Sequence, residues 1–327
     1  MIYSLAITGP TASGKTAISI ELAKALSAEI ISCDSMQIYK EMNIGTAKAT
    51  ELERQAVPHH MIDFLSPTED YSVEAYREGA LAAARDISSR GRLPMLVGGT
   101  GLYVDALMRA PISSVPESSR EYRDEKLAKI KTEEDVCALW ERLKEIDPVS
   151  AAAIHKNNVR RVIRAIEIYE ATGKTKSYFD ALSKKASPDM RVDMITLDFH
   201  NRENLYARVD ARVDDMVRGG LVSEVRSLYE RGLLKKNATA AQAIGYKEII
   251  SYLDGEITLD EATELIKLAT RRYAKRQLTW FRHEKGAHRL YIDGNDGKLR
   301  SGEEIINEAR LMADGLIKGF MNEIKGT

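Results

Sequence analysis

The sequence GPTASGKT at residues 9–16 fits G-x-x-x-x-G-K-[ST], the pattern of a phosphate-binding loop, at every constrained position. The apolar residues 5–7 before it predict the end of a buried strand, and residues 16–27 after it predict a helix. In such a loop the glycines let backbone N–H groups converge on phosphate oxygens, and the helix N-terminus adds partial positive charge. We therefore expect Lys15 to neutralise a phosphate and the Thr16 hydroxyl to hold Mg²⁺. The alternative is a coincidental glycine-rich turn, and the loop alone does not identify the molecule that carries the phosphate.

Composition sets limits on the protein class. A chain of 327 residues allows two domains or one large domain with an insertion, and 44% hydrophobic residues can form a large core. The net charge of −1 excludes a polycation, so any nucleic-acid surface must be a local patch. Cys33 and Cys137 show no metal-ligand spacing and are too few for a disulfide framework. Because no basic leader and no apolar run of bilayer length is evident, we expect a cytoplasmic protein without membrane contact.

Strand and helix patterns alternate in the first hundred residues and again after the middle of the chain. Helical spacing is clearest at residues 72–89, and residues 302–325 have the pattern of an amphipathic helix. Such alternation predicts a P-loop NTPase-like α/β fold, in which helices flank a parallel sheet. The apolar runs that predict strands are residues 2–8, 29–33, 94–97, 192–199 and 289–293.

The middle of the chain has a different pattern. Residues 110–119 are rich in Pro and Ser, which is typical of a linker, and residues 120–182 read as helices without a strand. We therefore expect an α/β catalytic core of residues 1–115 and 191–327, interrupted by an all-helical insertion domain at residues 116–190.

Polar residues follow two of the predicted strands. Asp34 comes directly after the second strand, and Gly98-Gly99-Thr100 follows the third. Ligands bind at the carboxyl ends of parallel strands, so these residues should meet the phosphate loop at one edge. Asp34 could order Mg²⁺, cap the next segment or act as a general base, and Ser35 and Gln37 could read a polar ring. The glycines could approach a ligand or merely form a turn.

Basic residues gather in two segments. Arg160, Arg161 and Arg164 share a helical neighbourhood, and residues 271–285 place Trp280 and Phe281 among several cations. Cations with aromatic residues suit contact with a nucleic-acid backbone and unstacked bases. The alternative for both segments is a solvated helix face over core residues.

Smaller groupings remain ambiguous. Arg208 and Arg212 lie four residues apart on one predicted helix and could reach phosphate or form an intrahelical pair with Asp215 or Glu203. His59 and His60 are adjacent, so on an extended chain they point to opposite sides and make a poor metal pair.

Taken together, these motifs resemble the tRNA dimethylallyltransferase family, also called the tRNA isopentenyltransferases. The resemblance covers about residues 4–293. The matching motifs are GPTASGKT at 9–16, DSMQIY at 34–39, IGTAK at 44–48, HHMID at 59–63, LVGGTGLY at 96–103, IGYKE at 244–248 and RRYAKRQLTWFR at 271–282.

The resemblance implies a reaction and a set of residues. A dimethylallyl group passes from dimethylallyl diphosphate to the exocyclic amine of the adenine 3′ of the anticodon in tRNA, and diphosphate is released. Asp34 matches the general base, Arg212 an arginine that assists at the diphosphate and Thr100 a threonine beside the target base; Lys15 completes the expected catalytic set. The expected diphosphate-binding residues are Gly9, Pro10, Thr11, Ala12, Ser13, Gly14, Lys15 and Thr16, with Thr16 as the Mg²⁺ ligand. The expected tRNA contacts are Asp34, Ser35, Met36, Gln37, Thr100, Arg123, Arg160, Arg161, Val162, Ile163 and Arg164.

His59 matches a position implicated in activity, and we expect a monomer. Two departures from the family pattern matter. Some members carry an arginine before the Gly-Tyr pair, where this chain has Gln242-Ala243-Ile244, and no Cys/His set forms a zinc-finger tail. The chain therefore resembles the compact bacterial type.

Two alternatives stay open. A small-molecule kinase that uses ATP would explain the loop and the sheet, although no acidic strand end of the Walker B type is evident and the late basic segment has no role in it. A non-catalytic, nucleotide-gated RNA-binding protein would bind RNA equally well after Asp34→Ala and would show no turnover.

Overall fold

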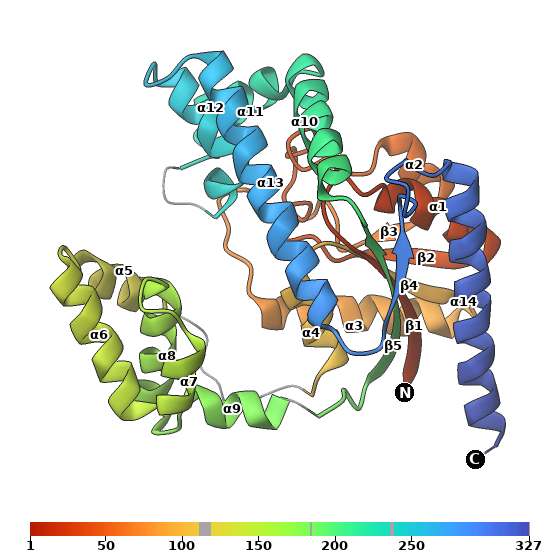
Figure 1. Cartoon of the computed structure of the whole chain (residues 1–327), viewed down its shortest axis with the longest axis horizontal. Helices are drawn as coiled ribbons and strands as arrows, with labels where there is room; N and C mark the ends of the chain where they lie inside the picture. The colour runs from red at the N-terminus through yellow and green to blue at the C-terminus, as the bar shows by residue number, and fades with distance from the viewer. Residues whose placement is uncertain (111–118, 184, 236–238, 327) are drawn as a thin grey trace. The chain divides into compact units, whose positions relative to one another are not determined.

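A single six-stranded sheet organises the structure, a computed structural model that describes residues 1–110, 119–183, 185–235 and 239–326. The described strands are all parallel and lie in the order β3-β2-β4-β1-β5-β6 (Figure 1). The predicted parallel α/β architecture is therefore confirmed. The strands are β1 (Ile2–Thr8), β2 (Ala28–Ser32), β3 (His59–His60), β4 (Leu93–Gly98), β5 (Met190–Asp198) and β6 (Ala287–Tyr291).

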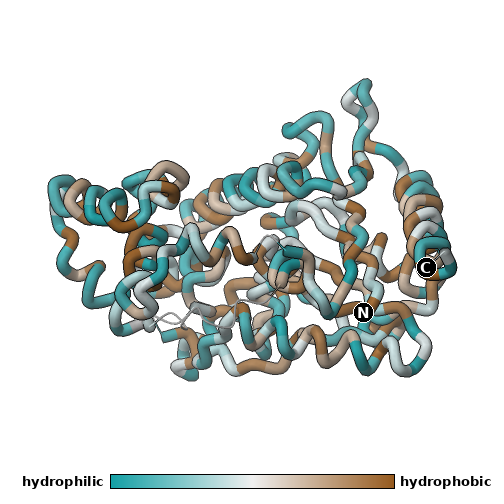
Figure 2. The backbone as a smooth tube through the Cα atoms, turned by 90° about the horizontal axis from the view of Figure 1, so that it is seen from below, coloured by the Kyte–Doolittle hydropathy of each residue, from teal (hydrophilic) through white to brown (hydrophobic). Residues whose placement is uncertain are grey.

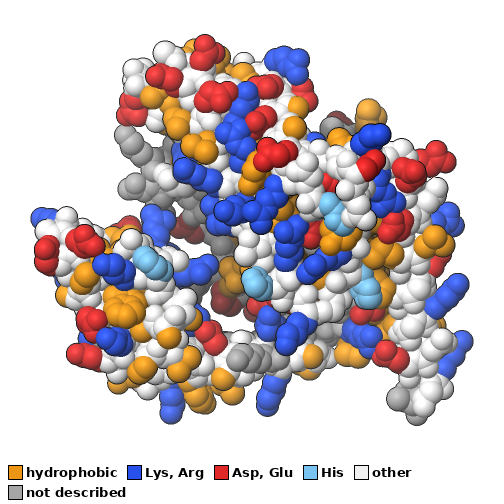
Figure 3. Space-filling model, viewed as in Figure 1, with side chains coloured by type: hydrophobic (Ala, Val, Ile, Leu, Met, Phe, Trp, Pro, Cys, Tyr) orange, Lys and Arg blue, Asp and Glu red, His pale blue; other side chains and the backbone are white. Residues whose placement is uncertain are grey.

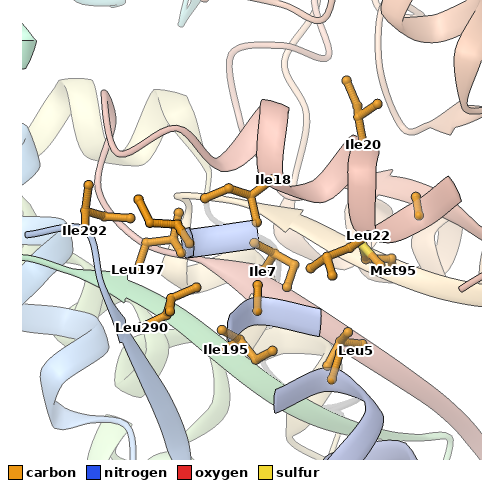
Figure 4. Packing of buried hydrophobic residues seen from close by; sticks show 14 of the residues in the cluster. Leu5, Ile7, Ile18, Ile20, Leu22, Met95, Ile195, Leu197, Leu290 and Ile292 are labelled. Carbon is orange, nitrogen blue, oxygen red and sulfur yellow. The ribbon is translucent and has the colours of Figure 1, made fainter. Parts of the chain in front are cut away.

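Helices cover both faces of this sheet. Because β1 leads to β2 and β3 leads to β4 in opposite directions across the sheet, right-handed crossovers place the connecting helices α1 (Lys15–Ala25) and α3 (Val73–Ser89) on opposite faces. Leu5 and Ile7 of β1 pack in one cluster with Ile18 and Leu22 of α1 (Figure 4). Burial on both faces explains why the strands read as continuous apolar runs.

The last helix, α14 (Gly302–Lys325), joins the same cluster. It begins with a capping box between Ser301 and Glu304, and it buries Ile305 and Ala309 while Leu311 is exposed. Apolar and polar residues alternate along it in Figure 2, as the predicted amphipathic pattern requires. Across the described ranges, no helix has both the length and the apolar character that crossing a bilayer demands.

A second apolar cluster lies beside the carboxyl edge of the sheet. It combines Ile38, Tyr39 and Met42 from the segment after β2 with residues from a group of helices. These helices therefore hold the segment that begins at Asp34. They are α10 (Arg202–Arg218), α11 (Leu221–Glu230), the 3₁₀ helix η1 (Ala240–Gln242), α12 (Tyr246–Leu253) and α13 (Leu259–His283); α2 (Glu51–Ala56) and α4 (Gly101–Met108) are short helices of the same unit.

The chain divides into two compact units. The core unit comprises residues 1–107 and 189–327, and the helical unit comprises residues 108–188. Most of the predicted linker, residues 111–118, lies outside the described residues. The helical unit packs around Leu143 and Val162, and its helices are α5 (Arg120–Ala128), α6 (Glu133–Ile146), α7 (Pro148–Ala153), α8 (Val159–Thr172) and α9 (Lys176–Ser183).

Candidate functional site

Three loops meet at the carboxyl edge of the sheet. The phosphate loop follows β1, Asp34 follows β2 and Thr100 follows β4, and these three strands are neighbours. The Thr100 N–H donates to the Cys33 carbonyl at 3.0 Å, and the Ser35 N–H donates to Thr100 Oγ1 at 3.1 Å. The structure thus brings the predicted loops together in the core unit.

The phosphate loop adopts a conformation that requires its glycines. Gly9 has a φ of 137°, and a Cβ there would lie 2.7 Å from the Leu197 carbonyl oxygen of β5. Gly14, with a φ of 93°, precedes α1 and provides no side-chain cap. The first N–H groups of a helix have no intrahelical partner, so this end of α1 can donate to an anion.

Lys15 lies folded over the same loop. Its Nζ donates to the Pro10 carbonyl at 2.7 Å and to the Gly9 carbonyl at 3.0 Å. Burial, together with the charge of Arg212, lowers the pKa of the Lys15 amine to about 7, despite the opposing charge of Asp34. Lys15 as a whole is half-buried, and its protonated amine is stabilised when an anion approaches.

Two arginines of α10 face this loop. Arg208 Nε donates to the Ala12 carbonyl at 2.8 Å, and burial lowers the pKa of the Arg212 guanidinium, with Asp34 opposing the shift. The intrahelical alternative is wrong for Arg208, and Asp215 pairs with Arg218 instead. Arg212 also lines a cavity of about 380 Å³ together with Thr16, Ile44, Ala47, Lys48, Glu53, Asp215 and Met216.

Asp34 is both a cap and a partner of these cations. Its Oδ1 accepts from the Met36 N–H at 2.9 Å and from the Gln37 N–H at 3.4 Å, so the capping alternative is realised. Among the described residues, none donates a hydrogen bond to Oδ2. The cap therefore fixes the carboxylate and leaves one oxygen for chemistry.

Gln37 has a different environment from the one predicted. Its Nε2 donates to the Thr46 and Ala47 carbonyls at 3.2 Å each, and its Oε1 accepts from Ser32 Oγ at 3.3 Å. The amide thus ties the segment after β2 to residues 46–47. This arrangement favours a structural role for Gln37 over direct reading of a base.

The IGTAK, HHMID and IGYKE motifs hold one another in place. The Glu224 carboxylate accepts from the backbone N–H groups of residues 43–45 at 2.7–3.1 Å and from the Tyr246 hydroxyl at 2.6 Å. Lys48 Nζ donates to Asp63 Oδ1 at 2.6 Å, and the Lys48 side chain is 1% exposed. These three motifs therefore shape the loop that borders the cavity.

The two histidines point to different partners, as their adjacency on β3 predicts. His59 Nδ1 lies 2.7 Å from the Val57 carbonyl oxygen, and burial lowers the pKa of the His59 imidazole. His60 Nε2 lies 2.7 Å from Glu29 Oε2. Hydrogen bonds from Arg90, with help from His60, hold the pKa of Glu29 at about 2. No group of three or more His, Cys, Asp and Glu residues in the described part of the chain could hold a metal ion.

Two arginines of the basic segment anchor helix α13 to neighbouring elements of the core unit. Arg271 Nη1 donates to both Asp210 oxygens at 2.6 Å, and Arg282 binds the Asp198 carboxylate through Nε and Nη2. Phe281 is 1% exposed, so it is a core residue. Asp198 is an acidic residue at the carboxyl end of β5 that was not predicted from the sequence. Its carboxylate is engaged by the Arg282 guanidinium.

One face of α13 also touches the site. Gln277 bridges the phosphate loop and the loop after β4, and a Cβ on Gly101 would overlap the indole of Trp280. Burial and the charge of Asp34 raise the pKa of Tyr273 to about 12, and Thr100 and Gln277 hydrogen-bond its hydroxyl. Tyr273 and Gln277 were not predicted as site residues. The signal in the sequence was their helical spacing with Trp280, at intervals of four and three residues.

The outer face of the same helix is basic. Arg272, Lys275 and Arg276 are exposed, and Figure 3 shows Lys and Arg side chains gathered over α13. The packing of the aromatic residues matches the alternative of a solvated helix face over core residues, and contact of the cations with a nucleic acid stays a prediction. Trp280 and Phe281 pack inward, and three cations face solvent.

The other predicted tRNA contacts lie in the helical unit. Arg160 and Arg161 of α8 are exposed, whereas Arg164 Nη1 donates to Glu167 Oε2 at 2.8 Å. Val162 and Ile163 are 0% and 1% exposed, so their side chains belong to the core of this unit and are not available to tRNA. Arg123 of α5 donates from Nε to the Ser119 carbonyl at 3.3 Å and is half-buried.

Two family models match this chain. The IPP transferase model matches residues 37–284, and the isopentenyl transferase model matches residues 2–63. The tRNA dimethylallyltransferase of Caldanaerobacter subterraneus is 48% identical over 282 residues, which cover 86% of this chain and 89% of that protein.

Solved structures give the same result. The full-length tRNA isopentenylpyrophosphate transferase of Bacillus halodurans matches with a TM-score of 0.72 and 41% identity over 100% of both chains. A eukaryotic dimethylallyltransferase acting on tRNA matches with a TM-score of 0.72 and 31% identity, over 89% of this chain and 74% of that chain.

Proposed function

Because the chain belongs to the IPP transferase family, the tRNA dimethylallyltransferases, we propose that it transfers a dimethylallyl group from dimethylallyl diphosphate to the exocyclic amine of the adenine 3′ of the anticodon in tRNA. Diphosphate is the second product. The observation that carries this proposal is the meeting of Asp34, Thr100, Lys15 and Arg212 at one edge of the sheet. It supplies a base and two cations around one reaction centre.

The phosphate loop and α10 bind the donor. The N-terminal N–H groups of α1 donate to phosphate oxygens, and Lys15 and Arg212 neutralise their charge. Negative charge grows on the diphosphate as the allylic C–O bond breaks. Fixed cations in a buried site stabilise that charge more strongly than water does, so they accelerate the departure of diphosphate.

The residues fit Mg²⁺ as a donor-bound cofactor. The Thr16 hydroxyl lies in the first turn of α1 and makes no hydrogen bond within the described residues. A hydroxyl oxygen is the hard ligand that Mg²⁺ prefers, and this ion usually takes its other ligands from substrate phosphates and water. When bound there, Mg²⁺ would add positive charge at the leaving diphosphate.

Asp34 acts at the acceptor. The exocyclic amine of adenine is a weak nucleophile because its lone pair is delocalised into the ring. As the amine nitrogen forms a bond to the allylic carbon, Asp34 Oδ2 accepts the proton that the nitrogen loses, and the diphosphate leaves with the electron pair of the C–O bond. Thr100 Oγ1 accepts a hydrogen bond from the Ser35 N–H at 3.1 Å, and Thr100 positions the target adenine beside the Asp34 carboxylate.

tRNA binding uses exposed cations of both units. Arg272, Lys275 and Arg276 in the core unit and Arg160 and Arg161 in the helical unit can contact phosphates. The target adenine must leave its stack to reach Asp34, as base-modifying enzymes require. Val162 and Ile163 support the two arginines of α8 from within the unit.

A labelled-transfer assay tests this function. The protein is mixed with tRNA, Mg²⁺ and radiolabelled dimethylallyl diphosphate, and label in tRNA is measured for the wild type, Asp34→Asn and the α14 control Asp314→Asn. We expect label with the wild type and the control, and transfer slower by roughly 10²–10⁴-fold with Asp34→Asn, with unchanged tRNA affinity. Near-normal transfer by Asp34→Asn would remove Asp34 as the base. Absence of label, with ATP-dependent phosphorylation of a metabolite, would support a kinase instead.

A further inference from the structure

The side chain of Gln277 connects two loops of the proposed active site. Its Oε1 accepts from the Thr11 N–H of the phosphate loop at 2.8 Å, and its Nε2 donates to the Gly99 carbonyl at 2.9 Å. The Thr11 N–H can only donate and the Gly99 carbonyl can only accept, so the two partners fix the orientation of the amide. The two hydrogen bonds join residues that are 266 and 178 positions apart in the sequence.

The surroundings hold this amide tightly. Gln277 is 5% exposed, and a Cβ on Gly99 would overlap its Nε2. α13 cannot drift away from the two loops easily, because Arg282 binds Asp198 at the carboxyl end of β5 and Arg271 binds Asp210 of α10. A buried amide with both hydrogen bonds made is costly to disturb, since each unsatisfied group loses its solvation.

The two loops carry different substrates in the proposed function. Thr11 belongs to the loop that binds the diphosphate, whereas Gly99 directly precedes Thr100 beside Asp34 and the acceptor base. Transfer requires the allylic carbon and the amine nitrogen to approach in line, and a displacement of 1 Å costs about 10²-fold in rate. A rigid link between the loops therefore bears directly on the chemical step.

We propose that Gln277 is a positioning residue that sets the spacing between the donor loop and the acceptor loop. This inference rests on the proposed function. It assigns Gln277 no contact with either substrate. Only a side chain of this length that both donates and accepts a hydrogen bond can satisfy both loops. Glutamate can do so when its carboxyl is protonated, whereas leucine can do neither.

The test compares Gln277→Leu and Gln277→Glu with a surface control, Gln55→Leu on α2, where Gln55 is exposed. For Gln277→Leu we expect kcat to fall about 10²-fold, with the KM values for tRNA and for dimethylallyl diphosphate changing less than about threefold. For Gln277→Glu we expect a similar loss at pH 8.5 and partial recovery, relative to wild type, as the pH falls to 6. The reason is that burial raises the pKa of the introduced carboxyl, and its protonated form restores the donor to Gly99.

Hydrogen–deuterium exchange gives a readout that needs no activity. We expect Gln277→Leu to speed exchange in residues 9–14, where the Thr11 N–H loses its acceptor, while the β1 strand and the circular dichroism spectrum stay as in the wild type. A wild type that transfers no label would defeat the proposed function, and the exchange result would still decide whether Gln277 links the loops.

Three results would overturn the positioning role. They are a kcat within twofold of wild type for both variants, a loss of activity that tracks only a weaker affinity for inorganic pyrophosphate, and an activity ratio for Gln277→Glu that does not change with pH.

Discussion

Lys15 illustrates how one half-buried residue can couple proton and phosphate binding. Its amine donates to two carbonyls of its own loop, and burial with the charge of Arg212 lowers the pKa to about 7. A diphosphate beside it would add negative charge to that of Asp34, so the pKa of Lys15 in the bound form must rise. Binding and protonation are then linked, and each favours the other.

This linkage predicts proton uptake on binding. At pH 8 a group with a pKa of about 7 is mostly neutral, so binding of inorganic pyrophosphate with Mg²⁺ should take up about 0.9 proton at Lys15. Affinity should consequently fall by up to about tenfold per pH unit above pH 7. Calorimetric titrations in buffers of different ionisation enthalpy measure the uptake.

The control for this prediction is Lys15→Arg, which is charged at every pH used. Subtracting its uptake removes the protons that belong to the ligand. Equal proton uptake by the wild type and Lys15→Arg would show that the amine is already charged in the protein alone.

At the scale of elements, α13 combines three structural features in one helix. It starts at a capping box between Thr258 and Glu261, it turns Gln277 and Trp280 toward the loops of the sheet edge, and it exposes Arg272 and Arg276. Its contact with α4 is close because Gly101 has no side chain. The helix can approach the site only where small residues allow it.

Gly101→Ala tests that close approach. The added methyl group would overlap the Trp280 indole, so we expect a loss of about 1–3 kcal/mol in the free energy of unfolding and reduced transfer. The matched control is Gly315→Ala in α14, where an added Cβ would meet no described atom within 4 Å beyond its chain neighbours and the backbone of its own helix. There we expect the free energy of unfolding to increase by about 0.5–1 kcal/mol. Urea unfolding measures both, and unchanged stability for Gly101→Ala would mean that Trp280 moves freely.

The same elements show what sequence could and could not predict. The buried strands are predictable because both faces of β1 and its neighbours are covered, which leaves continuous apolar runs. β3 is not, because two residues held by pairing to β2 leave no periodic signal. The role of Gln277 is not predictable for a related reason. Its hydrogen-bond partners, Thr11 and Gly99, become neighbours only through the strand order, which no local pattern encodes.

At the scale of the whole molecule, a chain with a net charge of −1 must concentrate its cations to bind tRNA. The core unit exposes Arg272, Lys275 and Arg276 on α13, and the helical unit exposes Arg160 and Arg161 on α8. These groups are separate surfaces on two compact units. A substrate that contacts both gains affinity from each, whereas the proposed diphosphate site lies in the core unit alone.

Reversing the α8 charges separates the two binding events. For the double variant Arg160→Glu/Arg161→Glu we expect tRNA affinity to fall roughly 10–100-fold, and the slope of log K against log[salt] to decrease by about 1 per lost phosphate contact. Pyrophosphate affinity should not change, because the phosphate loop lies in the core unit. The control Arg142→Glu/Lys144→Glu changes net charge equally on α6, where both side chains pair with nearby glutamates. If the control weakens tRNA binding as much, the effect is one of net charge, and Arg160 and Arg161 make no specific contact.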